Sequence, residues 1–140
     1  MLRTGLVHPE ILRALGTAGH GSQVLISDGN FPHSTAPQPA ATRVYLNVSR
    51  GLVRVSDVLE VLVPVLPIEA ATLMDPDSGD RPTVHAALEA LLPADTPVAR
   101  LHRFDFYAAT RTERLVLVIA TGDERAYANV LLTVGGIPSR

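Results

Sequence analysis

The segment that decides the fold is residues 19–33, with the sequence GHGSQVLISDGNFPH. Its centre, residues 24–26, is a short apolar run of the kind found in a β-strand buried on both faces. Gly19 suits the left-handed position just after a helix, and the polar residues that follow the run favour a loop. Ligands of open α/β sheets bind at the carboxyl ends of strands. His20 at the entrance of this strand and Asp28 at its exit are therefore candidate site residues.

Helical and strand patterns alternate over the rest of the chain. Apolar residues at helical spacing predict helices over about 9–18, 56–63, 83–92 and 104–112. Apolar or alternating runs predict strands over about 23–27, the key strand, and over 43–48, 65–74, 98–102, 115–120 and 130–134. This order predicts a single domain, 1–140, of the α/β class: three layers, α/β/α, around a single mixed, largely parallel sheet.

Several local expectations accompany these elements. Ser56 is expected to cap the second helix, the strand at 65–74 to be central, and Phe104 and Tyr107 to pack into the core. Residues 28–41 contain three prolines and predict a long loop, of the kind that is usually functional or mobile.

Composition excludes several classes of function. Charged residues make up 19% of the 140 residues and the net charge is -2, so no nucleic-acid partner is expected. There is no cysteine, which rules out disulfides, thiolate catalysis and cysteine-ligated metals. No apolar run is long enough to span a membrane and the first residues do not resemble a signal peptide, so we expect a cytoplasmic protein without a membrane partner.

The five histidines give no metal-binding pattern, because no two of them have the i, i+4 spacing of a metal-binding helix. No metal and no cofactor are therefore expected. His33 is a secondary candidate for contact with a ligand, and His85, on a polar helix face, is expected to be inert.

Three motifs occur in order along the chain. The first joins Gly19-His20-Gly21, the apolar strand and Ser27-Asp28-Gly29; the second is His102-Arg103-Phe104-Asp105-Phe106-Tyr107; the third is Tyr127-Ala128-Asn129, after the turn Thr121-Gly122-Asp123-Glu124. Together they resemble the ribose pyranase and fucose mutarotase family, over essentially the whole chain. One departure is Asp123, which stands where the family pattern has Glu.

The resemblance implies a role for each candidate residue. His20 would be the acid–base group, and Asp28 would orient His20 or hold a sugar hydroxyl. Tyr127 would relay a proton or bind a hydroxyl, and Asn129 would bind a hydroxyl. Arg103 would contact sugar oxygens, and it favours the fucose branch because the ribose branch has a histidine near this place.

The residue types suit this chemistry. Mutarotation opens a hemiacetal ring and recloses it, which needs one proton delivered to the ring oxygen and one removed from the anomeric hydroxyl. Histidine, with an ordinary pKa of about 6.5, can both give and take a proton near neutral pH. The reaction requires neither a cofactor nor a strong nucleophile.

The resemblance therefore implies an isomerase that interconverts the anomers of a free monosaccharide, most closely L-fucose. The alternatives are a D-ribose pyranase, a non-catalytic sugar-binding accessory of a transport system, and a structural ring-forming protein with a degenerate site. It also implies a ring-like homo-oligomer, such as a decamer, with pockets at subunit contacts. In that case the segment from Tyr127 to Asn129 would contribute to a pocket shared with a neighbouring subunit.

Overall fold

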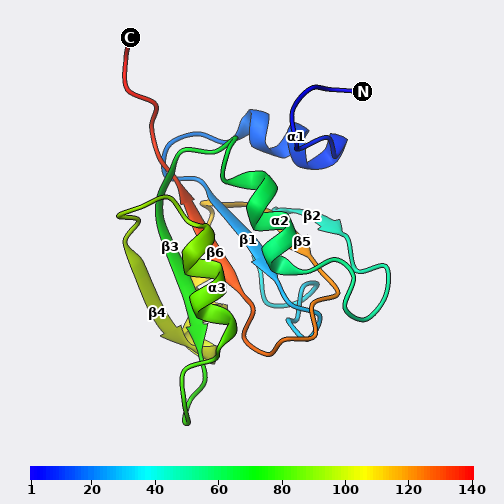
Figure 1. Cartoon of the computed structure of the whole chain (residues 1–140), viewed down its shortest axis with the longest axis vertical. Helices are drawn as coiled ribbons and strands as arrows, with labels where there is room; N and C mark the ends of the chain where they lie inside the picture. Colours follow the sequence, from blue (N-terminus) through cyan, green and yellow to red (C-terminus); the bar gives the residue numbers. More distant parts are fainter.

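A computed structural model describes residues 1–140 and has one six-stranded sheet at its centre (Figure 1). The strand order is β2-β5-β1-β6-β3-β4. The strands are β1 (Gln23–Ser27), β2 (Thr42–Tyr45), β3 (Ile68–Asp75), β4 (Val98–His102), β5 (Leu115–Ala120) and β6 (Val130–Val134). β6 is antiparallel to both of its neighbours and the other pairs are parallel, so the expected mixed, largely parallel sheet is confirmed.

Helices and a long loop cover the two faces of the sheet. The helices are α1 (Pro9–Thr17), α2 (Val55–Leu62), α3 (Val84–Leu91) and α4 (Arg103–Ala109). In Figure 1, α2 and α3 lie in front of the sheet and α1 lies at its upper end; all three share one apolar core with it. The opposite face packs against α4 and the loop at 28–41. The expected three layers are therefore present, with much of one layer formed by an irregular loop.

β1 is fully buried because it lies in the middle of the sheet. Its side chains alternate between the two cores: Val24 and Ile26 pack on the side of α1, α2 and α3, and Leu25 packs against Phe31 and Phe106 on the other side. All three are 0% exposed. A continuous apolar run is the pattern that such a two-sided strand requires.

The loop at 28–41 is held in place by one arginine. The guanidinium of Arg43 donates hydrogen bonds to the main-chain oxygens of His33, Pro37, Gln38 and Ala41, at 2.8, 3.0, 3.2 and 3.1 Å. Five N–H donors in a fixed plane allow one side chain to satisfy several carbonyls at once. The loop is therefore tied to the first residues of β2 rather than to a regular element.

Three local expectations were wrong. Ser56 lies inside α2, because Arg54 occupies the cap position. The N–H of Val55 at the start of the helix donates instead to the carboxylate of Asp123, far along the chain. Phe104 is 70% exposed and Phe106 is fully buried instead. The helix that carries both begins directly after β4, so its orientation is set by the strand and not by its own apolar spacing. The strand expected at 65–74 begins only at Ile68, although it is an interior strand, as expected, paired with β6 and β4.

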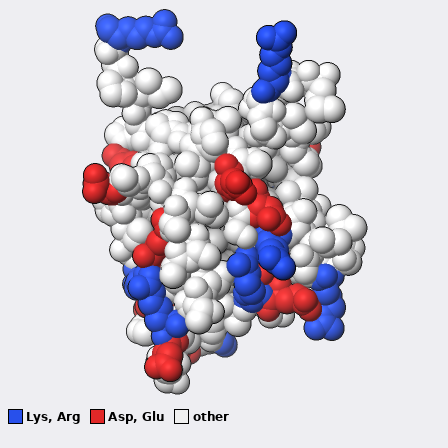
Figure 2. Space-filling model, viewed as in Figure 1, with Lys and Arg blue, Asp and Glu red and all other residues white.

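Charges of both signs intermix over the face that carries α1, α2 and α3 (Figure 2). The exposed ion pairs of the chain include Arg13 with Glu10 at 3.1 Å and Arg50 with Glu124 at 3.0 Å. No helix of the chain combines the length and the apolar character that crossing a membrane requires.

Candidate functional site

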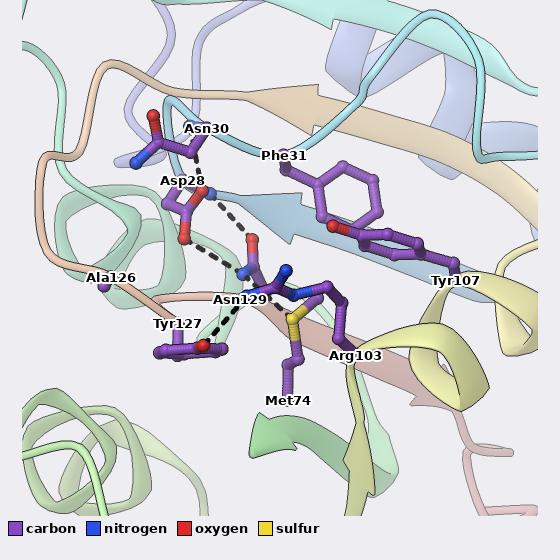
Figure 3. Close-up of a pocket in the computed structure, with 9 residues that line it drawn as sticks. All are labelled: Asp28, Asn30, Phe31, Met74, Arg103, Tyr107, Ala126, Tyr127 and Asn129. Atoms are coloured by element: carbon purple, nitrogen blue, oxygen red, sulfur yellow. Dashed lines mark hydrogen bonds between the residues drawn. The ribbon is translucent and has the colours of Figure 1, made fainter. Parts of the chain in front are cut away.

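A cavity of about 260 Å³ opens where β1 and β3 end and β6 begins. These ends meet because β6 is antiparallel to both strands. The volume lies just below the roughly 300 Å³ at which pockets for drug-sized molecules begin, so the cavity suits a smaller ligand. Its lining residues are Asp28, Asn30, Phe31, Met74, Arg103, Tyr107, Ala126, Tyr127 and Asn129 (Figure 3).

A buried carboxylate and a buried amide form the floor of the cavity. The side-chain Nδ2 of Asn129 donates to Oδ2 of Asp28 at 3.0 Å, and Oδ1 of Asn129 accepts from the main-chain N–H of Asp28 at 2.9 Å. The other oxygen of Asp28 accepts from the main-chain N–H of Asn30 at 3.0 Å. Asp28 and Asn129 are 3% and 2% exposed. Asn129 therefore lines the cavity while it fixes the orientation of Asp28.

The surroundings of Asp28 raise its pKa above the ordinary value. Burial is the largest cause, and the hydrogen bonds from Asn30 and Asn129 oppose it only in part. A buried carboxyl loses the water that would stabilise its charge, which favours the protonated form. A carboxyl with a raised pKa at the floor of a small cavity is a candidate proton donor or acceptor.

Arginine and tyrosine side chains meet at the mouth of the cavity. Nη2 of Arg103 donates to the phenol oxygen of Tyr127 at 3.0 Å, and the guanidinium carbon lies 5.9 Å from the centre of the Tyr127 ring. Arg103 is the first residue of α4, and Tyr127 precedes β6. The two predicted residues therefore come together although 24 positions separate them in the sequence.

Aromatic rings form one wall. The rings of Phe31 and Tyr107 are perpendicular, with centres 5.3 Å apart, and Phe104 packs on Tyr107 from outside. Burial raises the pKa of Tyr107, and Arg103 nearby lowers it in part. Figure 3 shows the wall facing the polar groups across the cavity. An apolar wall opposite hydrogen-bonding groups suits a ligand with both C–H and O–H surface.

The turn that leads to Tyr127 is anchored by Asp123. Its carboxylate accepts from the main-chain N–H of Val55 at 2.9 Å and from Nη2 of Arg125 at 2.6 Å. Burial would raise the pKa of this carboxyl, but the bonds from Arg125 and Val55 outweigh burial and lower it. The Glu-to-Asp departure thus retains a carboxylate that ties the turn to α2.

His20 lies apart from this cavity. His20 precedes β1, and Asp28 follows β1. Because β1 has five residues that rise about 3.3 Å each, its two ends lie about 13 Å apart. The exposed ring of His20 has Nε2 at 3.1 Å from Oε1 of Glu69, near the start of β3. Within one chain Asp28 is therefore too far from His20 to orient it.

The other two histidines singled out from the sequence are buried. His33 packs against the rings of Phe31 and Tyr45 and does not line the cavity. His85 was expected to lie on a polar helix face, but it is 0% exposed, and its Nε2 lies 3.1 Å from the main-chain oxygen of Tyr127. The expectation of a polar helix face was wrong, because α3 packs this face against the Tyr127 loop.

Five lining residues were not singled out as site residues from the sequence: Asn30, Phe31, Met74, Tyr107 and Ala126. Asn30 and Phe31 are neighbours of Asp28 in the sequence, which is a usable signal. Met74 carries none, because it reaches the cavity only through the pairing of β3 with β6. No group of three or more His, Asp or Glu side chains is arranged to hold a metal ion.

The fold and the cavity define a class: a small α/β protein with a polar, partly aromatic pocket at the strand ends, sized for a small ligand. The chain belongs to the RbsD / FucU transport protein family, whose pattern matches residues 1–137.

Solved structures agree with this assignment. FucU from Bifidobacterium longum is 30% identical, with a TM-score of 0.75 over 94% of this chain and 96% of that one. The fucose mutarotase of Streptococcus pneumoniae, in complex with L-fucose, and RbsD of Bacillus subtilis, complexed with D-ribose, are each 21% identical. Each has a TM-score of 0.82 over 99% of this chain and 100% of its own.

Proposed function

We propose that this chain is a monosaccharide mutarotase, an isomerase that interconverts the anomers of a free sugar, with L-fucose as the favoured substrate. The observation that carries the proposal is the meeting of Asp28, Arg103 and Tyr127 around one small open cavity with an aromatic wall. Similarity to a FucU protein at 30% identity supports it. The alternative is a D-ribose pyranase, which is supported by the similarity to a D-ribose-bound RbsD.

Each polar group has a part in the proposed reaction. Asp28 accepts a hydrogen bond from a sugar hydroxyl and exchanges a proton with it, which its raised pKa favours. Arg103 donates to sugar oxygens through its planar set of N–H groups. The phenol of Tyr127, which already accepts from Arg103, donates its proton to a further sugar oxygen.

His20 completes the reaction from a second copy of the chain in this proposal. His20 is the one predicted acid–base group that does not reach the cavity of its own chain. Its ring contacts Glu69 and is otherwise exposed, so it can also contact another molecule. The family resemblance implies pockets at subunit contacts in a ring-like oligomer. The proposed site is therefore shared between two chains.

Saturation-transfer NMR of anomer exchange tests this function, with L-fucose and D-ribose measured in parallel. We expect the wild-type chain to accelerate exchange of L-fucose, and His20→Ala to lower the rate by about 10²-fold or more. Arg103→Ala is expected to weaken the reaction as well. Arg50→Ala is the matched control, because Arg50 is an exposed arginine with one ion pair and does not line the cavity.

The other outcomes would each select a different function. Acceleration of pyranose–furanose exchange of D-ribose alone would make the chain a ribose pyranase. Sugar binding without acceleration would favour a binding accessory of a transport system. Neither binding nor acceleration of either sugar would contradict the proposal and favour a structural role.

A further inference from the structure

A buried histidine lies directly behind the loop that carries Tyr127. His85 belongs to α3 and is 0% exposed. Its Nε2 lies 3.1 Å from the main-chain oxygen of Tyr127, and its Nδ1 lies 2.9 Å from Nη1 of Arg100 and 3.5 Å from Oδ1 of Asp75. His85 does not line the cavity, so the proposed reaction does not use it directly.

The partners of His85 fix its tautomer. Nδ1 lies within hydrogen-bond distance of Arg100, at 2.9 Å, and farther from the carboxylate of Asp75, at 3.5 Å. Because arginine has only donors, we assign Nδ1 as the unprotonated acceptor. The proton of the neutral ring is then on Nε2, which donates to the carbonyl of Tyr127. His85 therefore connects a charged group of β4 to the main chain of the candidate site.

The main chain of Tyr127 needs such support. Its φ is 65°, in the left-handed region that residues other than glycine adopt rarely. Such a conformation persists where the surrounding contacts impose it. The carbonyl is bonded by His85, and the phenol is bonded by Arg103 at the mouth of the cavity. The residue is thus held at both ends.

Burial and the neighbouring arginines together lower the pKa of His85, which favours the neutral ring. Burial lowers its pKa most strongly, and Arg100 and Arg81 lower it further. The hydrogen bond to Tyr127 and the carboxylate of Asp75 oppose these effects without reversing them. Two charged side chains lie next to the ring, Asp75 from β3 and Arg100 from β4. Arg81, which precedes α3, and Arg100 both pair with Glu89 of α3.

We propose that His85 is a positioning residue for Tyr127: its Nε2–H holds the Tyr127 carbonyl so that the phenol stays beside Arg103 at the cavity. This inference deepens the proposed mutarotase function and rests on it for its effect on rate. The contact itself exists whatever the reaction is, so it has a readout of its own.

Two substitutions separate the two bonds of His85. The amide of His85→Gln extends as far as Nε2 and retains a donor for the Tyr127 carbonyl. His85→Asn extends only as far as Nδ1, so it retains an acceptor for Arg100 and loses the bond to Tyr127. His102→Asn is the control, because His102 is an exposed histidine whose Nδ1 lies 3.1 Å from the carbonyl of Pro76.

The first readout is independent of catalysis. NMR of chain labelled with 13C-tyrosine gives signals from Tyr45, Tyr107 and Tyr127, and Tyr127→Phe assigns the last of them. We expect the Tyr127 ring signal to shift in His85→Asn and to stay near its wild-type position in His85→Gln and in the control. The 15N shifts of His85 in the wild-type chain are expected to show the Nε2–H tautomer.

The second readout is sugar exchange at saturating and at low sugar. We expect His85→Asn to lower the maximal rate by about 10- to 100-fold, the effect of a misplaced catalytic group, with a smaller change in KM. His85→Gln is expected to retain most of the rate. Thermal unfolding of both variants shows whether each is folded at the assay temperature.

Defined outcomes would overturn the inference. An Nδ1–H tautomer in the wild-type chain, an unmoved Tyr127 signal in His85→Asn, or equal effects of Asn and Gln would each do so. A wild-type chain that accelerates neither sugar would contradict the proposed function instead, and the Tyr127 signal would still decide whether His85 positions this residue.

Discussion

At the scale of single residues, neighbours in one short motif have different roles. The side chain of Tyr127 meets Arg103 at the mouth of the cavity, while that of Asn129 is bonded to Asp28 on the floor. Both residues were expected to contact a ligand directly. The amide of Asn129 uses its oxygen and its N–H on Asp28, so its first role is to hold the carboxylate, and its contact with a sugar stays a prediction.

Asp28→Asn tests the cost of burying this carboxyl. The pKa of Asp28 is higher in the folded chain than its value of about 3.8 in the unfolded chain. The stability that Asp28 contributes is therefore fully present below about pH 3.8 and is lost as the pH rises through the pKa of the folded chain. We therefore expect the melting temperature of Asp28→Asn to rise relative to that of the wild type as the pH is raised from 3 to 7. Calorimetric melting over this range measures the difference.

The same substitution is expected to lower sugar exchange by about 10- to 100-fold, which corresponds to the loss of a hydrogen bond to a charged group. Asp105→Asn, at an exposed position of α4, serves as the control for both measurements. A variant that loses stability relative to wild type as pH rises would contradict the assigned burial cost.

At the scale of elements, the start of α2 depends on a residue far along the chain. The main-chain N–H of Val55 donates to Asp123, and the hydroxyl of Ser56 accepts from Arg125 instead of capping the helix. The turn after β5 and the start of α2 therefore form one unit. This unit leads directly to Tyr127, so the helix terminus and the candidate site are coupled.

Asp123→Asn is expected to destabilise the chain by about 1–3 kcal/mol at pH 7, because the buried carboxylate that pairs with Arg125 and the terminus of α2 is lost. The pKa of Asp123 is lower in the folded chain than its value of about 3.8 in the unfolded chain. The stability that Asp123 contributes is therefore present above about pH 3.8 and is lost as the pH falls through the pKa of the folded chain. The difference from wild type should therefore shrink below pH 4.

Urea unfolding at pH 7 and pH 3 measures this difference. Glu124→Gln is the control, because Glu124 is the adjacent acid in an exposed ion pair with Arg50, and such pairs contribute about 0–1 kcal/mol. Equal destabilisation by both substitutions would show that the burial of Asp123 is not the cause.

At the scale of the whole molecule, the two ends of β1 carry different parts of the proposed site. His20 and Glu69 lie at one end, and the cavity with Asp28 lies at the other. One chain alone cannot bring His20 to its own cavity across the length of the strand. A shared site requires one chain to present its His20 end to the cavity of the next, which is a head-to-tail contact of the kind that closes into rings.

Co-expression of His20→Ala and Asp28→Asn chains tests this arrangement. Each variant alone is expected to retain at most about a tenth of the wild-type exchange rate. Mixed oligomers are expected to recover about a quarter of the wild-type rate, the share of random contacts that join an intact His20 to an intact Asp28. Co-expression of His20→Ala with Arg13→Ala, a surface control, shows how the rate depends on the fraction of intact chains. An unmixed wild-type monomer with full activity on dilution would contradict the shared site.

The sequence by itself determined the layers of the fold, the bounds of β1, β5 and β6, and the motif residues Asp28, Arg103 and Tyr127. These follow from local information, because buried strands need apolar runs and turns need particular residues. It also determined the family, because the three motifs recur in order along the chain.

Only the tertiary structure decided the rest. Strand order and the antiparallel direction of β6 bring Met74 and Asn129 to Asp28, and no local pattern encodes such pairing. The orientation of α4 buries Phe106 instead of Phe104, and the packing of α3 places His85 behind Tyr127. The same topology separates His20 from the cavity. These outcomes depend on contacts between distant segments, whose energies are set by the packed fold and not by neighbours in the sequence.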